Sequence, residues 1–221
     1  MQTVAEKKSM PAEKAGKVSE ELVPVALNAG KGYLVFKRIF DIVASFAAGA
    51  ILLLPLILVA ILIRLDSPGP AIFRQERMGK DGKSFTIYKF RTMTTSAPSD
   101  MATRELEKHG QYVTKLGAFL RHSSIDELPQ LWNILKGDMS IVGYRPVVLT
   151  ETKLNEMRRE YGVFATRPGI TGLAQVSGRD NLSIEEKVLL DAEYVTKCSL
   201  GMDIRCILMT VKTVLTGEGV N

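Results

Sequence analysis

The chain has few of the residues that build disulfide frameworks and metal centres. Its 221 residues include two cysteines and two histidines, and Cys198 and Cys206 lack the spacing of metal ligands. No disulfide framework is implied, which suits a reducing compartment. His109 and His122 stand alone, which argues against a histidine-based metal site. The chain also lacks a Walker-type loop and a G-x-G-x-x-G motif after a strand, so an ordinary nucleotide-binding fold is not indicated.

Charge is absent from residues 42–63, a segment of about 22 residues that is long enough to cross the ~30 Å hydrocarbon layer of a membrane. A buried helix of a soluble protein is a less favoured interpretation. Pro55 lies near the middle of the segment and would kink a helix. Basic residues flank both ends, so the positive-inside rule gives no orientation. From these features a spanning helix and a re-entrant helix that returns to the same face are equally favoured.

The net charge is +5 and the isoelectric point about 9.2. This excess suits nucleic acid, an anionic membrane face or a phosphorylated substrate without choosing among them. Residues 1 to about 30 are rich in Lys, Glu and Ala and predict a mobile tail. Residues 66–70 contain two prolines and a glycine and should end the membrane helix.

The remaining pattern predicts a small hairpin followed by helices. Residues 71–76 and 84–90 have the pattern of short strands around a loop at 79–82. Residues 147–161 predict a charged surface helix, and residues 136–138 end the helix before it. A capping box of Ser183 and Glu186 opens another helix. The last helix opens near Asp203 and has an apolar face that suits either the protein core or the membrane interface.

Two adjacent carboxylates, Asp126 and Glu127, precede an apolar helical pattern at 128, 131, 132 and 135. At a helix N-terminus the macrodipole favours negative charge, so both are expected to be ionised there. Ser124 and Glu127 match a capping box, but Pro129 would then lie inside the helix. With Asp126 as the N-cap, Pro129 falls in the first turn. Such a carboxylate can act as a nucleophile or bind a divalent cation, although an acidic cap without chemistry is the commoner case.

Several basic residues occur beside glycine- and proline-rich turns rather than along helix faces. Guanidinium groups on rigid turns can bind phosphate oxygens bidentately. We therefore expect a converging anion site made by Lys89, Arg91, Arg121, Arg145, Arg167 and Arg179. Together with the carboxylates and the membrane segment, this site suggests metal-assisted phosphoryl transfer near a bilayer.

These motifs resemble those of the bacterial sugar transferases, the monotopic polyprenyl-phosphate phosphoglycosyl transferases. The resemblance runs from about residue 33 to residue 216, in order and at similar spacing. The matching stretches are residues 37–41, 67–75, 88–93, 126–133, 136–143, 167–172 and 178–179.

The resemblance implies an enzyme that moves a sugar-1-phosphate from a UDP-sugar to undecaprenyl or another polyprenyl phosphate and releases UMP. This is the first membrane step in making exopolysaccharide, capsule, O-antigen or glycoprotein glycans. Asp126 would be the nucleophile that holds the phosphosugar covalently, and Glu127 would help Asp126 to bind Mg²⁺. Lys89, Arg121 and Arg145 match basic positions of the family motifs, and Arg167 and Arg179 are weaker matches. A non-catalytic membrane adaptor for glycan assembly is the alternative.

The resemblance also favours the re-entrant helix, kinked at Pro55. The implied fold is α+β and mostly helical: a monotopic membrane protein with a re-entrant helix, interfacial amphipathic helices and a small β-hairpin. We expect a mobile tail at 1–32, the re-entrant helix at 33–65 and a cytoplasmic catalytic domain at 66–221, on the cytoplasmic face of the bacterial inner membrane. Expected partners are membrane lipids, downstream glycosyltransferases and a second copy of the chain, but no nucleic acid.

Two departures from the family pattern matter. Many members have Gly-Pro-Arg-Pro where this chain has Gly143-Tyr144-Arg145-Pro146. Tyr144 is expected to relax a rigid turn and to change nucleotide or sugar contacts. Some members have Ser-Pro at the kink where this chain has Leu54-Pro55, which changes how the freed backbone is satisfied. The long N-terminal membrane domain of larger members is absent, so we expect the minimal catalytic form.

Overall fold

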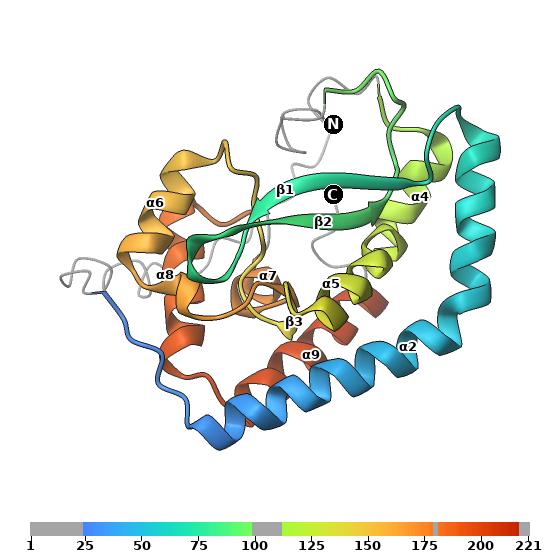
Figure 1. The fold of residues 1–221 in the computed structure, drawn as a ribbon. Coiled ribbons are helices and arrows are strands. Elements are labelled where there is room, and N and C mark those ends of the chain that lie inside the picture. The colour runs from blue at the N-terminus through green and yellow to red at the C-terminus, as the bar shows by residue number, and fades with distance from the viewer. Residues whose placement is uncertain (1–23, 99–111, 179–180, 217–221) are drawn as a thin grey trace, which may run out of the picture.

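The computed structural model describes residues 24–98, 112–178 and 181–216, and these are mostly helical with two small sheets (Figure 1). The elements in chain order are α2 (Lys31–Asp66), β1 (Ile72–Met78), η1 (Lys80–Gly82), β2 (Ser84–Phe90), α4 (Lys115–His122), η2 (Ile125–Gln130), α5 (Leu131–Lys136), β3 (Ser140–Val142), α6 (Thr152–Glu160), η3 (Val163–Ala165), β4 (Gly169–Thr171), α7 (Leu173–Ser177), α8 (Ile184–Thr196) and α9 (Leu200–Thr216). The expected α+β class with a predominance of helix is confirmed.

The long apolar helix α2 runs along one edge of the molecule and then changes direction (Figure 1). It is a single helix of 36 residues with Pro55 inside it. Within the described residues it is the one helix long and apolar enough to cross a membrane, judged by length and composition. Its most apolar window is only 6% buried, so the interpretation as a core helix of a soluble protein is wrong. Ile51 and Leu54, each 77% exposed, show how much apolar surface α2 presents.

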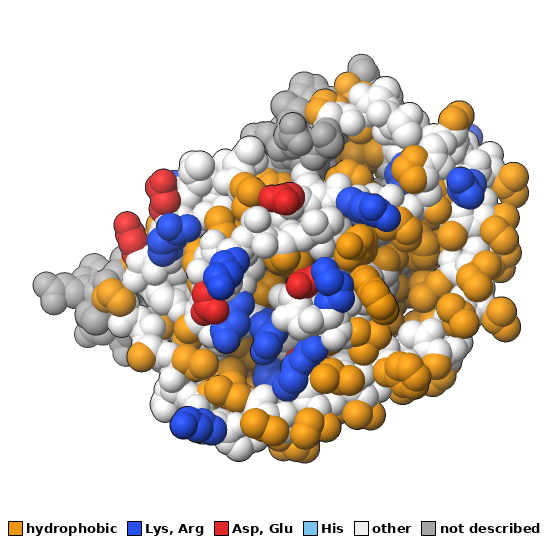
Figure 2. Space-filling model, in the orientation of Figure 1, with side chains coloured by type: hydrophobic (Ala, Val, Ile, Leu, Met, Phe, Trp, Pro, Cys, Tyr) orange, Lys and Arg blue, Asp and Glu red, His pale blue; other side chains and the backbone are white. Residues whose placement is uncertain are grey.

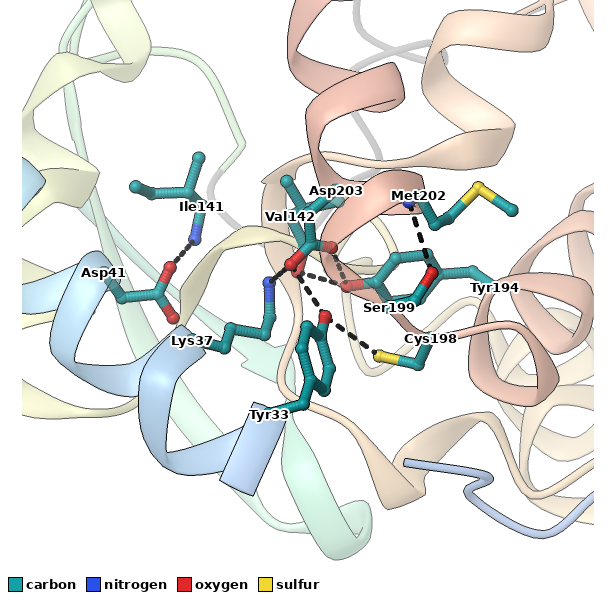
Figure 3. A network of polar contacts seen from close by, with 10 residues as sticks. All are labelled: Tyr33, Lys37, Asp41, Ile141, Val142, Tyr194, Cys198, Ser199, Met202 and Asp203. Atoms are coloured by element: carbon teal, nitrogen blue, oxygen red, sulfur yellow. Dashed lines mark hydrogen bonds and ion pairs between the residues drawn. The ribbon is translucent and has the colours of Figure 1, made fainter. Parts of the chain in front are cut away.

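Polar contacts fix the first half of α2 to the rest of the protein (Figure 3). One carboxylate oxygen of Asp203, in α9, accepts hydrogen bonds from Tyr33 at 2.7 Å and Lys37 at 2.9 Å. The other oxygen accepts a hydrogen bond from the Tyr194 hydroxyl of α8 at 2.7 Å. Farther along α2, the buried carboxylate of Asp41 accepts a backbone N–H of β3 at 3.0 Å. These contacts hold an apolar helix in a defined place beside the domain.

The described part of the expected tail does not hang free. The backbone N–H of Val25 donates to the carbonyl of Tyr161, and that of Asn28 donates to the carbonyl of Val195. Val25 also packs against the core cluster around Val163. Residues 24–30 therefore belong with the domain, and α2 begins at Lys31 rather than at residue 33. The rest of the expected tail, residues 1–23, lies outside the described residues.

The predicted hairpin is confirmed. β1 pairs antiparallel with β2 from Ile72 opposite Phe90 to Met78 opposite Ser84, and the turn at η1 places Asp81 at φ 56°. A second sheet, which the sequence did not indicate, pairs β3 with β4 in parallel. The two sheets and α5 enclose a small core around Ile87, Ile134 and Met139. This core supports the turn that carries the two carboxylates.

Apolar side chains remain exposed on several helices besides α2. Phe119 of α4 and Trp132 of α5 are 59% and 58% exposed, so the apolar pattern that predicts the α5 helix includes both an exposed residue and Leu131, which packs against the core. In α9, Ile204 and Leu208 are also exposed, while Asp203 and Cys206 on another side are buried. The last helix therefore meets both expectations in part, because Met202, Cys206 and Ile207 pack in a core cluster while Ile204 and Leu208 face outward. Figure 2 shows hydrophobic side chains gathered along the edge of the molecule that α2 occupies.

Candidate active site

The two carboxylates lie in a short 3-10 helix, η2, which leads directly into α5. Ser124 precedes it in the left-handed conformation, with φ 57°, and its carbonyl accepts the backbone N–H of Glu127 at 3.2 Å. Asp126 and Glu127 occupy the first turn of this helical segment, as expected. Both predicted caps are wrong, because the Ser124 side chain makes no cap hydrogen bond and Asp126 lies inside η2. Pro129 also lies inside η2, which accounts for the tighter helix at this point.

Glu127 forms the centre of a compact ion cluster. Its Oε1 atom accepts hydrogen bonds from Lys89 Nζ at 2.7 Å and from an Arg145 Nη at 3.2 Å. The side chains of Lys89 and Glu127 are each only 17% exposed. Burial raises the pKa of Glu127, but the two positive charges and their hydrogen bonds outweigh burial and lower the pKa to about 2. Glu127 is therefore ionised at every physiological pH.

The carboxyl group of Asp126 has the opposite perturbation. Burial raises its pKa to about 6, and the negative charge of Glu127 acts in the same direction. The positive charges of Lys89, Arg121 and Arg145 oppose this rise. Two adjacent carboxyl groups with pKa values pushed apart are typical of sites where the groups have different chemical roles. Asp126 is ionised above pH 6 and poorly solvated, which is a suitable state for a nucleophile.

The predicted basic cluster converges only in part. Lys89 and Arg145 contact Glu127, and the charge of Arg121 reaches Asp126. The Nε of Arg121 donates to Thr92 Oγ1 at 2.8 Å, which helps to orient the guanidinium. These three residues and the two carboxylates form the candidate site.

Arg91 and Arg167 direct their hydrogen bonds to backbone carbonyls instead. Arg91 is 7% exposed and donates to three carbonyls at the end of α2 and just beyond it, those of Ile63, Ser67 and Pro68. The Nε of Arg167 donates to the carbonyl of Gly137 after α5 at 2.8 Å. Both residues cap helix ends. Arg91 also lines the cavity that contains the two carboxylates, whereas Arg167 does not, and a phosphate-binding role for either residue stays a prediction. Arg179 lies outside the described residues.

A cavity of about 1660 Å³ opens at the carboxylates and extends to α2. Its lining includes Asp126, Glu127 and the three converging basic residues. It also includes Ile57, Ala60, Ile61 and Arg64 from the second half of α2. The cavity thus joins an ionic site to the helix with the largest apolar surface.

The donor set at the carboxylates fits a magnesium ion that also binds substrate. Among the described residues, no three His, Cys, Asp or Glu side chains come together as a metal site. Mg²⁺ does not need such a set, because proteins usually bind it through one or two carboxylates while water and substrate phosphates complete its shell. Asp126 and Glu127 can supply those carboxylates.

The sequence predicts that Tyr144 changes substrate contacts, but its side chain does not line the cavity. Its side chain is 1% exposed and packs edge-to-face on Phe164, with ring centroids 5.5 Å apart. Its hydroxyl is buried without a hydrogen-bond partner in the described structure. An effect of Tyr144 on nucleotide or sugar contacts could therefore only be indirect. Sequence reasoning also missed Arg158, which is 2% exposed although it lies in the helix predicted to be on the surface.

Comparison with known proteins relates this chain to sugar transferases. The sequence model of the family described as "Bacterial sugar transferase" matches residues 32–217. The "Galactosyl transferase CpsE" of Streptococcus agalactiae is 41% identical over 201 residues, which cover 85% of this chain and 44% of that protein. The "UDP-glucose:undecaprenyl-phosphate glucose-1-phosphate transferase" of Caulobacter vibrioides is 40% identical over 190 residues, covering 82% of this chain and 70% of that protein.

Relatives of different lengths share this region. The "Uncharacterized sugar transferase EpsL" of Bacillus subtilis is 39% identical over 191 residues, 85% of this chain and 91% of that protein. In contrast, the chain spans less than half the length of the streptococcal relative. The shared region includes the carboxylate turn, the hairpin and α2, and the chain belongs to the bacterial sugar transferase family.

Proposed function

We propose that this protein is a phosphoglycosyl transferase that moves a sugar-1-phosphate from a UDP-sugar to a polyprenyl phosphate. The observation that carries the proposal is the cavity that joins the Asp126–Glu127 pair and its basic residues to α2. The charged side chains of the lining suit a nucleotide diphosphosugar, and its apolar side chains from α2 suit a lipid acceptor. The name of the Caulobacter relative, which gives UDP-glucose as donor and undecaprenyl phosphate as acceptor, supports the same pair of substrates.

The first step is an attack by a carboxylate oxygen of Asp126 on the β-phosphorus of the UDP-sugar. A bond forms between that oxygen and phosphorus, the bond from the β-phosphorus to the bridging oxygen breaks, and UMP leaves with the electron pair. The sugar phosphate is then held as a mixed anhydride on Asp126. This use of a carboxylate nucleophile divides a difficult transfer into two easier steps.

The second step returns Asp126 to its starting state. A phosphate oxygen of the polyprenyl phosphate attacks the phosphorus of the intermediate, and the bond to the Asp126 oxygen breaks. The product is a polyprenyl diphosphate sugar. Lys89, Arg121 and Arg145 offset the negative charge of the phosphates in both steps, as fixed charges do in phosphoryl transfer.

Glu127 and Asp126 are the residues that would hold Mg²⁺, which when bound offsets the charge of the diphosphate and of the leaving UMP. The two bonds from Lys89 and Arg145 to Glu127 keep that carboxylate ionised and in place. Asp126 is left as the less stabilised anion of the pair, with a pKa of about 6. This division assigns nucleophilic attack to Asp126 and an electrostatic role to Glu127.

The membrane arrangement we propose is re-entrant, with α2 bending at Pro55 and both of its ends on the cytoplasmic face of the inner membrane. Two features support it. The bend of α2 lies in its exposed apolar part (Figure 1), and its ends carry Lys31 and Arg64. The exposed Phe119, Trp132 and Leu208 would lie in the interface, where amphipathic helices bury one face among the lipid headgroups.

The test is nucleotide release by the protein in lipid nanodiscs with Mg²⁺, undecaprenyl phosphate and a panel of UDP-sugars. We expect UMP from at least one donor. Release of UDP would mean direct transfer of the sugar and would contradict the role given to Asp126. Release from no donor, with a well-folded protein that still binds glycan-assembly proteins, would favour the adaptor alternative.

A further inference from the structure

The loop that carries Arg145 has an unusual backbone, because each of its five consecutive carbonyls accepts a hydrogen bond. The donors come from the hairpin, from α6 and from β4. For the carbonyls of residues 144 to 148 in order they are Gly169 N at 2.8 Å, Arg158 Nη at 2.8 Å, Arg77 Nη at 3.4 Å, Met78 N at 3.1 Å and Asn155 Nδ2 at 3.0 Å. A loop of the length of 144–148 is normally satisfied in part by water. Here protein groups donate to all five carbonyls of the loop.

Arg158 is the donor with the most elaborate support. Its Nε and one Nη donate to Asp191 Oδ2 at 3.0 and 2.6 Å, and its other Nη donates to the carbonyl of Arg145. The Arg158 and Asp191 side chains are each 2% exposed. The Arg158 guanidinium also lies 5.1 Å from the ring centroid of Tyr144. Three bonds and one ring contact thus hold a single guanidinium group between α6, α8 and the loop.

Stability alone does not explain why the chain buries the Arg158–Asp191 pair. Desolvation of two charges is expensive, and well-packed apolar residues often do as well or better. Burial raises the pKa of Asp191 despite its contact with Arg158. The loss of solvation therefore outweighs the attraction between the two charges. Arg158 is also the residue whose remaining donor reaches the backbone of Arg145. Arg145 in turn contacts Glu127 through a side chain that is 51% exposed.

We propose that Arg158 is a positioning residue for the transfer reaction, which fixes the backbone of Arg145 so that its guanidinium remains on Glu127 and over the phosphate site. This inference rests on the proposed function. Tyr144 takes part through its buried ring, whose centroid lies 5.1 Å from the Arg158 guanidinium.

The test compares Arg158→Lys with Arg159→Lys. Lysine at 158 keeps a charge for Asp191, but its donors lie on one nitrogen and cannot reproduce the contacts that three separate guanidinium nitrogens make to Asp191 and to the Arg145 carbonyl. Arg159 is the next residue of α6 and is exposed, so the same exchange there is the matched control. We expect Arg158→Lys to lower kcat/KM by about tenfold to a hundredfold, the usual effect of displacing one charge-assisted contact. Arg159→Lys should leave kcat/KM unchanged.

Two further readouts separate positioning from simple stability. If Arg145 is displaced, its charge no longer opposes the rise in the Asp126 pKa, so the acid limb of the pH profile should move to higher pH. The effect of Arg145→Ala should also be much smaller in the Arg158→Lys protein than in the wild type, because the two changes remove the same contact. An unchanged acid limb with additive effects would overturn the inference, as would an unchanged kcat/KM.

A second variant keeps the test decisive if Arg158→Lys does not fold. Asp191→Asn preserves shape and weakens the anchor of Arg158, so it should move kcat/KM and the acid limb in the same directions by smaller amounts. A folded Asp191→Asn protein with wild-type kinetics would refute the positioning role. Failure of the proposed function is distinguishable, because the wild-type protein itself would then release no UMP.

Discussion

Removing the positive charge of Lys89 should change both the stability and the pH dependence of this protein. Lys89 Nζ lies 2.7 Å from Glu127 Oε1, and both side chains are 17% exposed. Lys89→Met keeps most of the side-chain volume and removes the charge. A second pair, Lys153 Nζ and Glu185 Oε1, has the same residue types at the same 2.7 Å, but its side chains are 65% and 48% exposed. Lys153→Met is therefore a control that differs mainly in burial.

The stability effect follows from the burial of the pair. Leaving one partner of a fully buried pair alone costs about 3–5 kcal/mol. The Glu127 side chain is partly exposed and keeps Arg145, so we expect a loss of roughly 2 kcal/mol, or about 4–8 °C in Tm. Because the Glu127 pKa is lowered to about 2, the stabilisation is present above its unfolded pKa near 4.5 and is lost as the pH falls through 2. The difference between wild type and Lys89→Met should therefore be full at pH 7 and shrink below pH 4.5.

The kinetic effect has the opposite pH dependence. The charge of Lys89 opposes the burial that raises the Asp126 pKa to about 6, so its removal should raise that pKa further, by about 1–2 units. The attacking group is the ionised carboxylate, so the acid limb of kcat/KM should move to higher pH. Part of the activity lost at pH 7 should return at pH 8.5.

The assay is UMP release across pH 5 to 9 in nanodiscs, together with thermal unfolding of the same preparations. Lys153→Met should leave the acid limb in place and change Tm little, because exposed pairs contribute little to stability. An acid limb that stays near pH 6 in Lys89→Met would refute the electrostatic account of the Asp126–Glu127 pair. So would equal effects of the two lysine substitutions on stability.

Two other substitutions test the assignments made from the structure. Tyr144→Phe removes a buried hydroxyl without a partner, so thermal unfolding should show unchanged stability or a gain of up to about 1 kcal/mol, and the KM for the UDP-sugar should not change; a raised KM would return Tyr144 to the substrate site. Arg91→Met removes the side-chain donor of three carbonyls near the end of α2, of which that of Ile63 keeps the backbone N–H of Ser67, so it should cost about 2 kcal/mol of unfolding free energy in denaturant titrations. A stable Arg91→Met protein with weakened UDP-sugar binding would instead support the phosphate role expected from the sequence.

The sequence predicts local structure well where the signal is local. The hairpin follows from two short strand patterns around a glycine-rich turn, and Ser183 with Glu186 forms the predicted capping box. The αL glycine at 137 ends α5 where expected. Each of these features depends on a few neighbouring residues, so no knowledge of the tertiary fold is needed.

Apolar periodicity identifies helices but not their partners. Trp132 and Leu208 belong to apolar helical patterns, yet both are exposed in the structure. The same pattern suits a helix packed on protein and one packed on lipid, and only the fold shows which it is. The 3-10 helix at Asp126 and Glu127 could not be predicted from the sequence, because Pro129 is compatible with more than one local helix geometry.

Basic residues were the hardest to assign. An arginine beside a rigid turn can bind a phosphate or cap a helix end, and its sequence neighbours do not decide between them. Arg145 donates to Glu127, whereas Arg91 and Arg167 donate to backbone carbonyls. Arg158 carried no signal, because its partner Asp191 is 33 residues away and its helix has a polar sequence.

The central claim is that Asp126 carries the phosphosugar, and one measurement tests it most directly. The protein in nanodiscs without polyprenyl phosphate is incubated with Mg²⁺ and the UDP-sugar that supports turnover, then quenched for intact-mass and peptide mass spectrometry. The account predicts one equivalent of UMP and a mass increase of one sugar phosphate on the peptide that contains Asp126, both absent in Asp126→Asn. A wild-type protein that turns over with no adduct, or an Asp126→Asn protein that keeps its activity, would contradict it.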